Sequence, residues 1–408
     1  MRISLAFVEP GTVLSAFVLR LTGSHFFVGL AGAIMPAGWM WPQLLMSNVL
    51  EHRPRKMPFF KLGMGIRVAA WLTIVVCMLR IDPTRKSVLV ASFFFFYLIA
   101  ASSLGISSIP YMEIVSKSIH PLRRARFFST RQFIGGFIAF LIGEFLIKSV
   151  LSDASGLVFP FNYALLFAFA VVATLAAFLI FLLIREPIQR VKTERKSLIQ
   201  HLKQGPHFMR TDVHYRRFII FRMFAHSAGM CMPFYVPYAL LNLGVPDSTI
   251  GSFLAVVALS GVISTALWGH VGEKYGVRWI LMGMSAFGCV SPLIAICIPL
   301  FPIPLQIPSY FLIFAMNGIS VNGMMVGFMT YMLNVAPPLT RPSYLGFMNT
   351  LLFPFSFVTV LGGLIVSRLG YQGVFAISFG MSLLAFTMTT RLEEVFYREE
   401  IQSDEEIL

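Results

Sequence analysis

The sequence predicts an all-α membrane protein whose twelve transmembrane helices form two similar bundles of six. Three observations support this fold class. The 408 residues are 57% hydrophobic and only 12% charged, whereas soluble domains are about 25% charged. The apolar residues form segments of roughly 20, the length of helix that crosses the core of a bilayer. One long basic stretch, Arg185–Arg217, separates six such segments from six others.

Each apolar segment is expected to be a helix, because none alternates like a strand of a membrane β-barrel. Glycine and proline inside the segments are compatible with helices, since membrane helices tolerate both. The expected spans before the basic stretch are Ile3–Leu19, Phe26–Met46, Phe59–Leu79, Val88–Val115, Phe127–Val150 and Phe161–Ile184. Those after it are Phe218–Leu243, Ile250–Trp268, Trp279–Leu300, Ile307–Val335, Tyr344–Val366 and Tyr371–Thr390.

The chain is expected to have four parts: an N-terminal bundle (1–184), a basic cytoplasmic linker (185–217), a C-terminal bundle (218–391) and an acidic cytoplasmic tail (392–408). The linker carries nine Lys or Arg residues and three Asp or Glu residues. Some of its apolar residues would share one face of a helix lying on the membrane surface. A solvated linker whose charges only fix the topology is an equally open interpretation. The apolar residues concerned are Val191, Leu198, Ile199 and Leu202.

The distribution of lysine and arginine sets the expected orientation, because these residues accumulate in cytoplasmic loops. With the linker in the cytoplasm, 24 of them lie on the cytoplasmic side, six lie on the other side, and Arg67 and Arg222 lie within helices. Both termini are therefore expected to be cytoplasmic, in an inner (plasma) membrane.

Composition also argues against several classes of function. The net charge of +14 comes from positive residues scattered over short loops, which does not indicate a nucleic-acid-binding surface. The four cysteines lie inside apolar segments and show neither metal-ligand spacing nor a disulfide framework. We therefore expect no nucleic-acid partner, no metal, no cofactor and no enzymatic activity.

The two halves contain similar sequence patterns. Tyr111-Met112 matches Tyr331-Met332, and Pro-Leu-Arg-Arg at 121–124 matches Pro-Leu-Thr-Arg at 338–341. Two six-helix units of the same orientation form a parallel repeat.

The loop after the eighth segment carries a recognisable motif. Gly269, Glu273, Gly276 and Arg278 follow the spacing Gly-x-x-x-Asp-x-x-Gly-x-Arg/Lys, with Glu in place of Asp. The chain thereby resembles the major facilitator superfamily over essentially its whole length. The loop after the second segment, where that family usually keeps the motif best, retains basic residues but lacks both glycines. The resemblance implies a transporter that rocks two halves around a central site.

Several residues are candidates for a cytoplasmic gate. The glycines of the motif, Gly269 and Gly276, would permit helix contact and a tight turn. Glu273 and Arg278 could pair with each other or with a neighbouring helix end. Elsewhere, Arg67 could reach the cytoplasm or pair with Glu113, a structural role that we favour. Arg124 belongs to the repeated pattern.

Other polar residues are candidates for the substrate or proton pathway. Glu9 precedes Pro10, which cannot donate to the helix ladder; it could couple protons, bind substrate, form a structural pair or lie at the interface. His226 can titrate near neutral pH or simply pack. The amides either bond to a neighbouring helix or line a wet cavity. These amides are Gln132, Asn317, Asn322 and Asn349.

The expected function is secondary active transport of a small solute by a monomer surrounded by lipid, with protons as the coupling ion. Few intramembrane charges suggest a neutral, amphipathic or zwitterionic solute. The alternative is a non-transporting membrane protein of this fold, an assembly factor or receptor. The first helix is short, with nine residues before Pro10 against about twenty between Phe218 and Pro237. We therefore expect an N-terminally shortened chain, with Glu9 near the inner interface.

Overall fold

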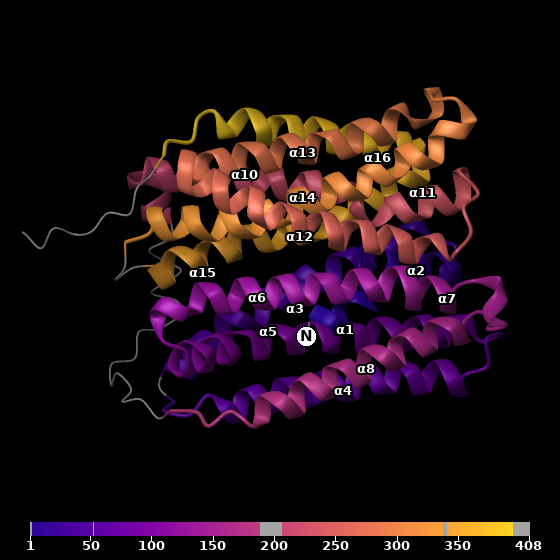
Figure 1. Cartoon of the computed structure of the whole chain (residues 1–408), viewed down its shortest axis with the longest axis horizontal. Coiled ribbons are helices and arrows are strands. Elements are labelled where there is room, and N and C mark those ends of the chain that lie inside the picture. The colour runs from indigo at the N-terminus through magenta and orange to yellow at the C-terminus, as the bar shows by residue number, and fades with distance from the viewer. Residues whose placement is uncertain (1, 52, 188–205, 338–340, 395–408) are drawn as a thin grey trace, which may run out of the picture.

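The computed structural model describes residues 2–51, 53–187, 206–337 and 341–394. Within these ranges the protein contains helices and no strands, and the long helices run roughly along one direction (Figure 1). Nine of these helices are long and apolar enough to cross a membrane. One of them, Tyr344–Thr389, bends at Gly370 and supplies two crossings. A 27-residue helix (His25–Glu51) and a short apolar helix (Val13–Thr22) bring the described crossings to twelve, which confirms the predicted fold class.

The N-terminal half contains six crossings. Gly23 ends α2 in the left-handed conformation, with φ of 64° and its N–H donating to the Leu19 carbonyl at 2.8 Å. Proline begins α6, where its missing N–H costs nothing. In order, the helices are α1 (Arg2–Ala6), α2 (Val13–Thr22), α3 (His25–Glu51), α4 (Met57–Arg80), α5 (Lys86–Ser118), α6 (Pro121–Leu141), a π-helical turn (Ile142–Ile147), α7 (Lys148–Val150), a 3-10 turn (Asp153–Ser155) and α8 (Phe161–Leu182).

The C-terminal half contains the other six crossings. Asp212 caps α10, because its side chain accepts a hydrogen bond from the Tyr215 N–H at 2.9 Å. In order, the elements are α10 (Val213–Ala228), a 3-10 segment (Gly229–Phe234), α11 (Tyr235–Asn242), α12 (Thr249–Tyr275), α13 (Val277–Cys297), a 3-10 turn (Ile298–Leu300), α14 (Ile303–Val335), α15 (Arg341–Leu352), a 3-10 segment (Phe353–Phe357) and α16 (Val358–Thr389).

Large apolar side chains lie on the outside of the molecule as well as inside it. Leu183, Leu300 and Ile303 are about 80% exposed, with values of 80%, 81% and 81%. Soluble proteins rarely expose extended apolar surface, whereas a bilayer requires it. Together with the apolar helices, this surface makes the chain an integral, multi-pass membrane protein.

The two halves lie side by side, and their contact is made by α3 with α16 and by α6 with α12 (Figure 1). We call the end where α8 finishes and α10 starts the linker side, and the opposite end the far side. Some expectations concern residues outside the described ranges. These are the surface helix containing Val191, Leu198, Ile199 and Leu202, the repeat residues 338–340, and the tail beyond residue 394.

Candidate functional site

The first and seventh crossings both depart from regular α-helix, as do the fifth, at the π-helical turn Ile142–Ile147, and the eleventh, at the 3-10 segment Phe353–Phe357. The first is not helical between α1 and α2, over residues 7–12, which include Glu9 and Pro10. The seventh changes from α10 to a 3-10 segment at Gly229–Phe234, which contains Pro233. The offset between equivalent residues of the two halves can be read from α4 and α13, whose first residues, Met57 and Val277, are 220 positions apart. Pro10 and Pro233 are 223 apart, so the two breaks occupy corresponding positions of the repeat.

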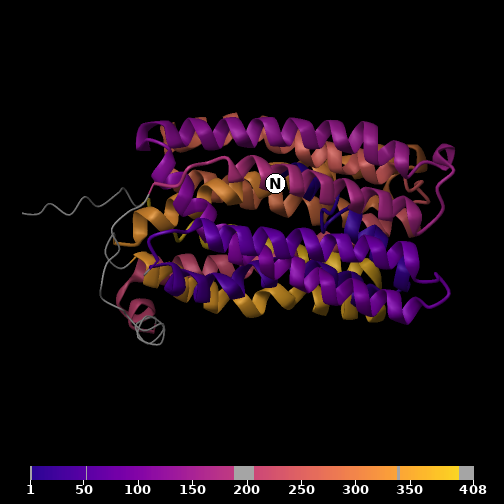
Figure 2. The same ribbon diagram turned by 90° about the horizontal axis from the view of Figure 1, so that it is seen from below.

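The break in the first crossing lies about halfway through the molecule. Phe7 packs on Phe169 with ring centroids 5.6 Å apart. Phe169 is eight residues from the far-side start of α8 at Phe161, which corresponds to about 12 Å of helix. Figures 1 and 2 both place the N-terminal mark near the middle of the long axis. Glu9 therefore lies at mid-depth, and the expectation of a position near the inner interface is wrong.

The Glu9 carboxylate turns back onto the start of α2. Its Oε2 accepts a hydrogen bond from Thr12 Oγ1 at 2.9 Å, and the backbone N–H groups of Gly11 and Thr12 also bond to the carboxylate. A Cβ at Gly11 would lie 3.3 Å from Oε2, so glycine leaves room for this turn. Among the described residues, no Lys, Arg or His forms an ion pair with Glu9.

A buried tyrosine and a buried arginine lie in the same half as Glu9. Tyr97 of α5 is fully buried and donates to the Ala31 carbonyl at 3.2 Å. It lies within electrostatic range of both Glu9 and Arg67. Arg67 of α4 is 1% exposed, and neither its Nε nor its Nη1 has a hydrogen-bond partner among the described residues. Arg67 therefore neither reaches the cytoplasm nor pairs with Glu113, which is exposed.

The amides do not form one cluster. Asn322 of α14 donates to the Gly261 carbonyl at 2.7 Å and to Thr265 Oγ1 at 2.8 Å, both on α12. Its Oδ1 accepts from Gln132 Nε2 at 3.3 Å, a contact between the two halves. Asn317, Asn349 and His226 are half-buried. The amides of Asn317 and Asn349 make no hydrogen bond within the described part of the chain.

On the linker side, carboxylates at the ends of the two halves cap neighbouring helices. Glu394, after α16, accepts from the backbone N–H groups of Val277 and Arg278 at 2.7 and 2.9 Å. Arg278 Nη2 donates to the Thr390 carbonyl at 3.2 Å. Glu186, after α8, accepts from Lys56 N and Met57 N, both at 2.8 Å. Each carboxylate thus satisfies N–H groups at a helix start, which belong to α13 and α4.

The structure shows a different carboxylate at the Gly269–Arg278 motif from the one that the sequence predicted. Glu394, rather than Glu273, is the carboxylate at the motif, while Glu273 is exposed and has no described hydrogen bond or ion pair. Gly276 has φ of 96° and packs against Glu394, where a Cβ would collide with the carboxylate. Gly269 is exposed, and a Cβ there would meet nothing within 4 Å. The side chain of Arg124 lies outside the described set.

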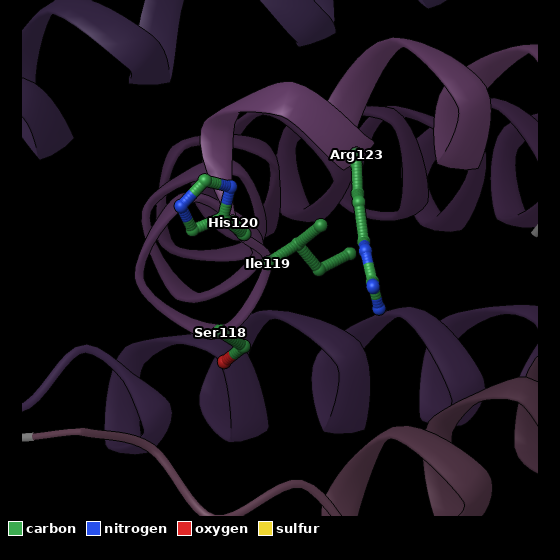
Figure 3. Close-up of a pocket in the computed structure, with 4 residues that line it drawn as sticks. All are labelled: Ser118, Ile119, His120 and Arg123. Atoms are coloured by element: carbon green, nitrogen blue, oxygen red, sulfur yellow. The ribbon is translucent and has the colours of Figure 1, made fainter.

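A cavity of about 700 Å³ lies at the corner between α5 and α6 on the linker side. Ser118, Ile119, His120 and Arg123 line it (Figure 3). It contains none of the candidate pathway residues. It is an open surface cavity at the helix corner and does not reach the breaks in the first and seventh crossings.

The two halves are joined tightly on the far side. Arg20, at the end of α2, forms an ion pair with Asp247 before α12 at 2.6 Å. Ser252 of α12 donates to Glu144 Oε2 at 2.8 Å, and Thr359 Oγ1 donates to the Gly29 carbonyl at 2.8 Å. Gly143, in the π-helical turn after α6, and Gly251 of α12 let these two segments meet backbone to backbone.

Comparison with known proteins agrees with this geometry. The model of the Major Facilitator Superfamily matches residues 217–406. The match covers the C-terminal half of the chain, and that half is therefore similar to the Major Facilitator Superfamily. No curated protein matches the sequence.

Solved structures of several transporters share the fold of this chain over nearly its whole length. The nucleoside transporter NupG is 12% identical, with a TM-score of 0.71 and 96% of each chain covered. A D-xylose-proton symporter is 14% identical, with a TM-score of 0.71 and 98% and 97% covered. A bacterial homologue of the iron transporter ferroportin, 14% identical, gives 0.68 in its inward-facing state, covering 96% of each chain. The outward-facing structure of the same homologue has a TM-score of 0.62.

Sequence reasoning missed several members of this site. Glu186 and Glu394 lie in short segments after apolar spans, and the repeated charged end of each half was the only available signal. Tyr97 is one of 12 tyrosines in an apolar chain, and nothing in its local sequence distinguishes it from a packing residue.

Proposed function

We propose that this protein is a secondary active transporter, rather than an enzyme, that moves a small solute by alternating access. In this proposal it is a monomer in an inner (plasma) membrane, surrounded by lipid, with no nucleic-acid partner. The linker side, where α16 ends, faces the cytoplasm, as the excess of 24 lysines and arginines over six requires, while α1 starts at mid-depth (Figure 1). Residues 1–184 and 218–391 are the moving units, joined by the linker 185–217 and followed by the tail 392–408.

The observation that carries this proposal is the pair formed by the first and seventh crossings, both of which are interrupted. Helices broken at corresponding positions of two repeats are the usual location of transporter binding sites, because broken segments leave backbone groups free for ligands. Here the non-helical turn at residues 7–12 and the 3-10 segment Gly229–Phe234, where i→i+3 hydrogen bonds replace the α-helical ones, lie at corresponding positions of the two halves. Polar backbone away from water is costly unless it contacts a ligand, water or side chain.

The closed far side supports an inward-facing state. Arg20–Asp247, Ser252–Glu144 and Thr359–Gly29 would have to separate for the far side to open. The chain also superposes better on the inward-facing than on the outward-facing ferroportin homologue. Alternating access would therefore proceed by breaking these contacts between the halves.

In this proposal Glu9 is the proton-coupling group. Ionised, it is held by the Thr12 hydroxyl and the first N–H groups of α2. Protonated, it would lose these charge-assisted bonds and free the turn before α2 to move. Arg67 is a buried positive charge in the same half. Gln132 and Asn322 link the two halves near this depth, and His226, Asn317 and Asn349 remain candidate pathway residues.

The linker-side gate is part of the same proposal. Gly276 and Arg278 are held by Glu394, and Gly269 and Glu273 lie on the same loop. Arg124 and Glu113 belong to the corresponding region of the N-terminal half. We propose that these residues set the balance between the inward-facing and outward-facing states.

A flux experiment tests the proposal. The full chain is reconstituted into vesicles containing a pH-sensitive dye, and a library of small solutes is added under a proton gradient. We expect saturable, solute-dependent proton entry in the wild type. Glu9→Gln should abolish gradient-driven entry while solute exchange persists, because a permanently neutral side chain cannot carry the proton.

Two results would count against this account. An unchanged pH dependence in Glu9→Gln would exclude Glu9 as the coupling group. Solute binding without any flux, across the whole library, would favour the non-transporting receptor or assembly factor.

A further inference from the structure

Arg222 is a buried cation without an anion. It lies on the buried face of α10 and is 9% exposed. Its Nε is fully buried without a hydrogen-bond partner. No ion pair or hydrogen bond joins any of its N–H groups to a residue in the described ranges. The structure turns its side chain into the C-terminal half.

An aromatic ring fixes the guanidinium of Arg222. Its central carbon lies 3.9 Å from the centroid of Phe328 on α14. A ring beneath the guanidinium stabilises its charge, but it cannot accept the N–H groups at the edge of the plane. These donors form a rigid fork that matches the two oxygens of a carboxylate or phosphate. The stacking therefore orients the fork and leaves it unoccupied.

Other arginines in the described chain have partners that Arg222 lacks. Arg20 pairs with Asp247, Arg131 donates to the Tyr111 hydroxyl, and Arg217 pairs with Glu393. Arg67 also has N–H groups without a partner, but no aromatic ring in the described chain stacks on its guanidinium to orient it. An uncompensated charge inside a membrane protein is costly and marks a functional position.

We propose that Arg222, with Phe328 and His226, forms a binding site for a small oxyanion, a carboxylate or a phosphate. His226 lies four residues after Arg222, one helical turn further along α10, and can add a second donor. This inference rests on the proposed transport function for the origin of the anion, which would be the solute or part of it. It replaces the expectation of a solute without net charge.

A soluble anion fits this site better than a lipid headgroup. Arg222 is four residues beyond the start of the apolar span at Phe218, which corresponds to about 6 Å along the helix, so the comparison rests on the direction of its side chain. It packs against α14 within the bundle instead of facing the bilayer. A headgroup would have to leave the interface and enter the C-terminal half to reach it.

Thermal unfolding of the purified full chain tests the site without any need for flux. Sodium phosphate and sodium lactate are compared with sodium chloride at matched ionic strength. We expect either or both oxyanions to raise Tm by about 2–4 °C at concentrations well above Kd. Arg222→Gln should lose this rise, while Arg222→Lys should keep a smaller one, because lysine lacks the fork.

Arg216→Gln is the matched control. Arg216 lies on the same helix but donates to the backbone carbonyls of Met209 and Arg210, so this variant should keep the full rise. If Arg222→Gln does not fold, Phe328→Leu replaces it and should weaken the rise by freeing the guanidinium.

Three outcomes would overturn the proposal. The first is no rise in the wild type with either oxyanion. The second is a rise that survives both Arg222→Gln and Arg222→Lys unchanged. The third is a Tm that rises with phosphatidylglycerol relative to phosphatidylcholine, while neither phosphate nor lactate raises it. The thermal test measures binding and does not depend on transport. If the thermal test fails while the vesicles show proton-coupled flux, only the anion site is refuted and the transport proposal is unaffected.

Discussion

Individual residues show where sequence patterns carry information and where they do not. The motif around Gly276 and Arg278 marked a helix end that is capped by a carboxylate, but the carboxylate is Glu394, 116 positions beyond Arg278. Local spacing cannot reveal a partner that only the packing of α16 against α13 brings close. Asn322 was identified as a polar residue in an apolar helix, yet its partner Gln132 lies in the other half.

The cap on α13 leads to a prediction at this scale. Glu394→Gln should weaken two charge-assisted hydrogen bonds to the first N–H groups of α13 and lower the free energy of unfolding by about 1–3 kcal/mol. Glu273→Gln is the matched control, since Glu273 is exposed and has no described partner. The Tm of each purified variant is measured in detergent, and we expect a lower Tm for Glu394→Gln than for Glu273→Gln. Equal values for both variants would show that the cap contributes nothing to stability.

At the scale of elements, the spans were predictable because a bilayer dictates the length of each apolar segment. The boundary between the last two crossings was expected between Val366 and Tyr371, and the structure bends there at Gly370, with φ of 71°. The interruptions were less predictable. Pro10 and Pro233 both lie in breaks, but Pro36 and Pro42 lie inside the continuous helix α3. Proline alone therefore does not identify a break.

The contact between α6 and α12 gives a prediction for an element. Gly251→Leu should prevent closure of the far side, because a side chain there would collide with the backbone of Gly143 and Lys148. Gly65→Leu is the control, since a Cβ at Gly65 meets nothing within 4 Å. The readout is thiol labelling of Thr359→Cys, at a position that is 9% exposed and bonded to Gly29. Labelling should rise in Gly251→Leu only, and equal labelling in both backgrounds would refute this role.

At the scale of the whole molecule, the chain combines a superfamily fold with a far side held shut by contacts between its halves. The sequence predicted the two bundles from the central basic stretch and the weak repeat. It could not predict which side is closed, because that depends on pairs such as Arg20 and Asp247, which are 227 positions apart. A transporter of this fold must open these contacts during its cycle.

The most direct test of alternating access measures a distance across the far side. Spin labels are placed at Ser24 and Ser248, beside the Arg20–Asp247 pair, after replacement of the four native cysteines. We predict a short-distance population and a second, longer one, whose ratio changes with pH and shifts in Glu9→Gln. A single short distance in the wild type and in Glu9→Gln, at every pH and with every solute, would contradict alternating access.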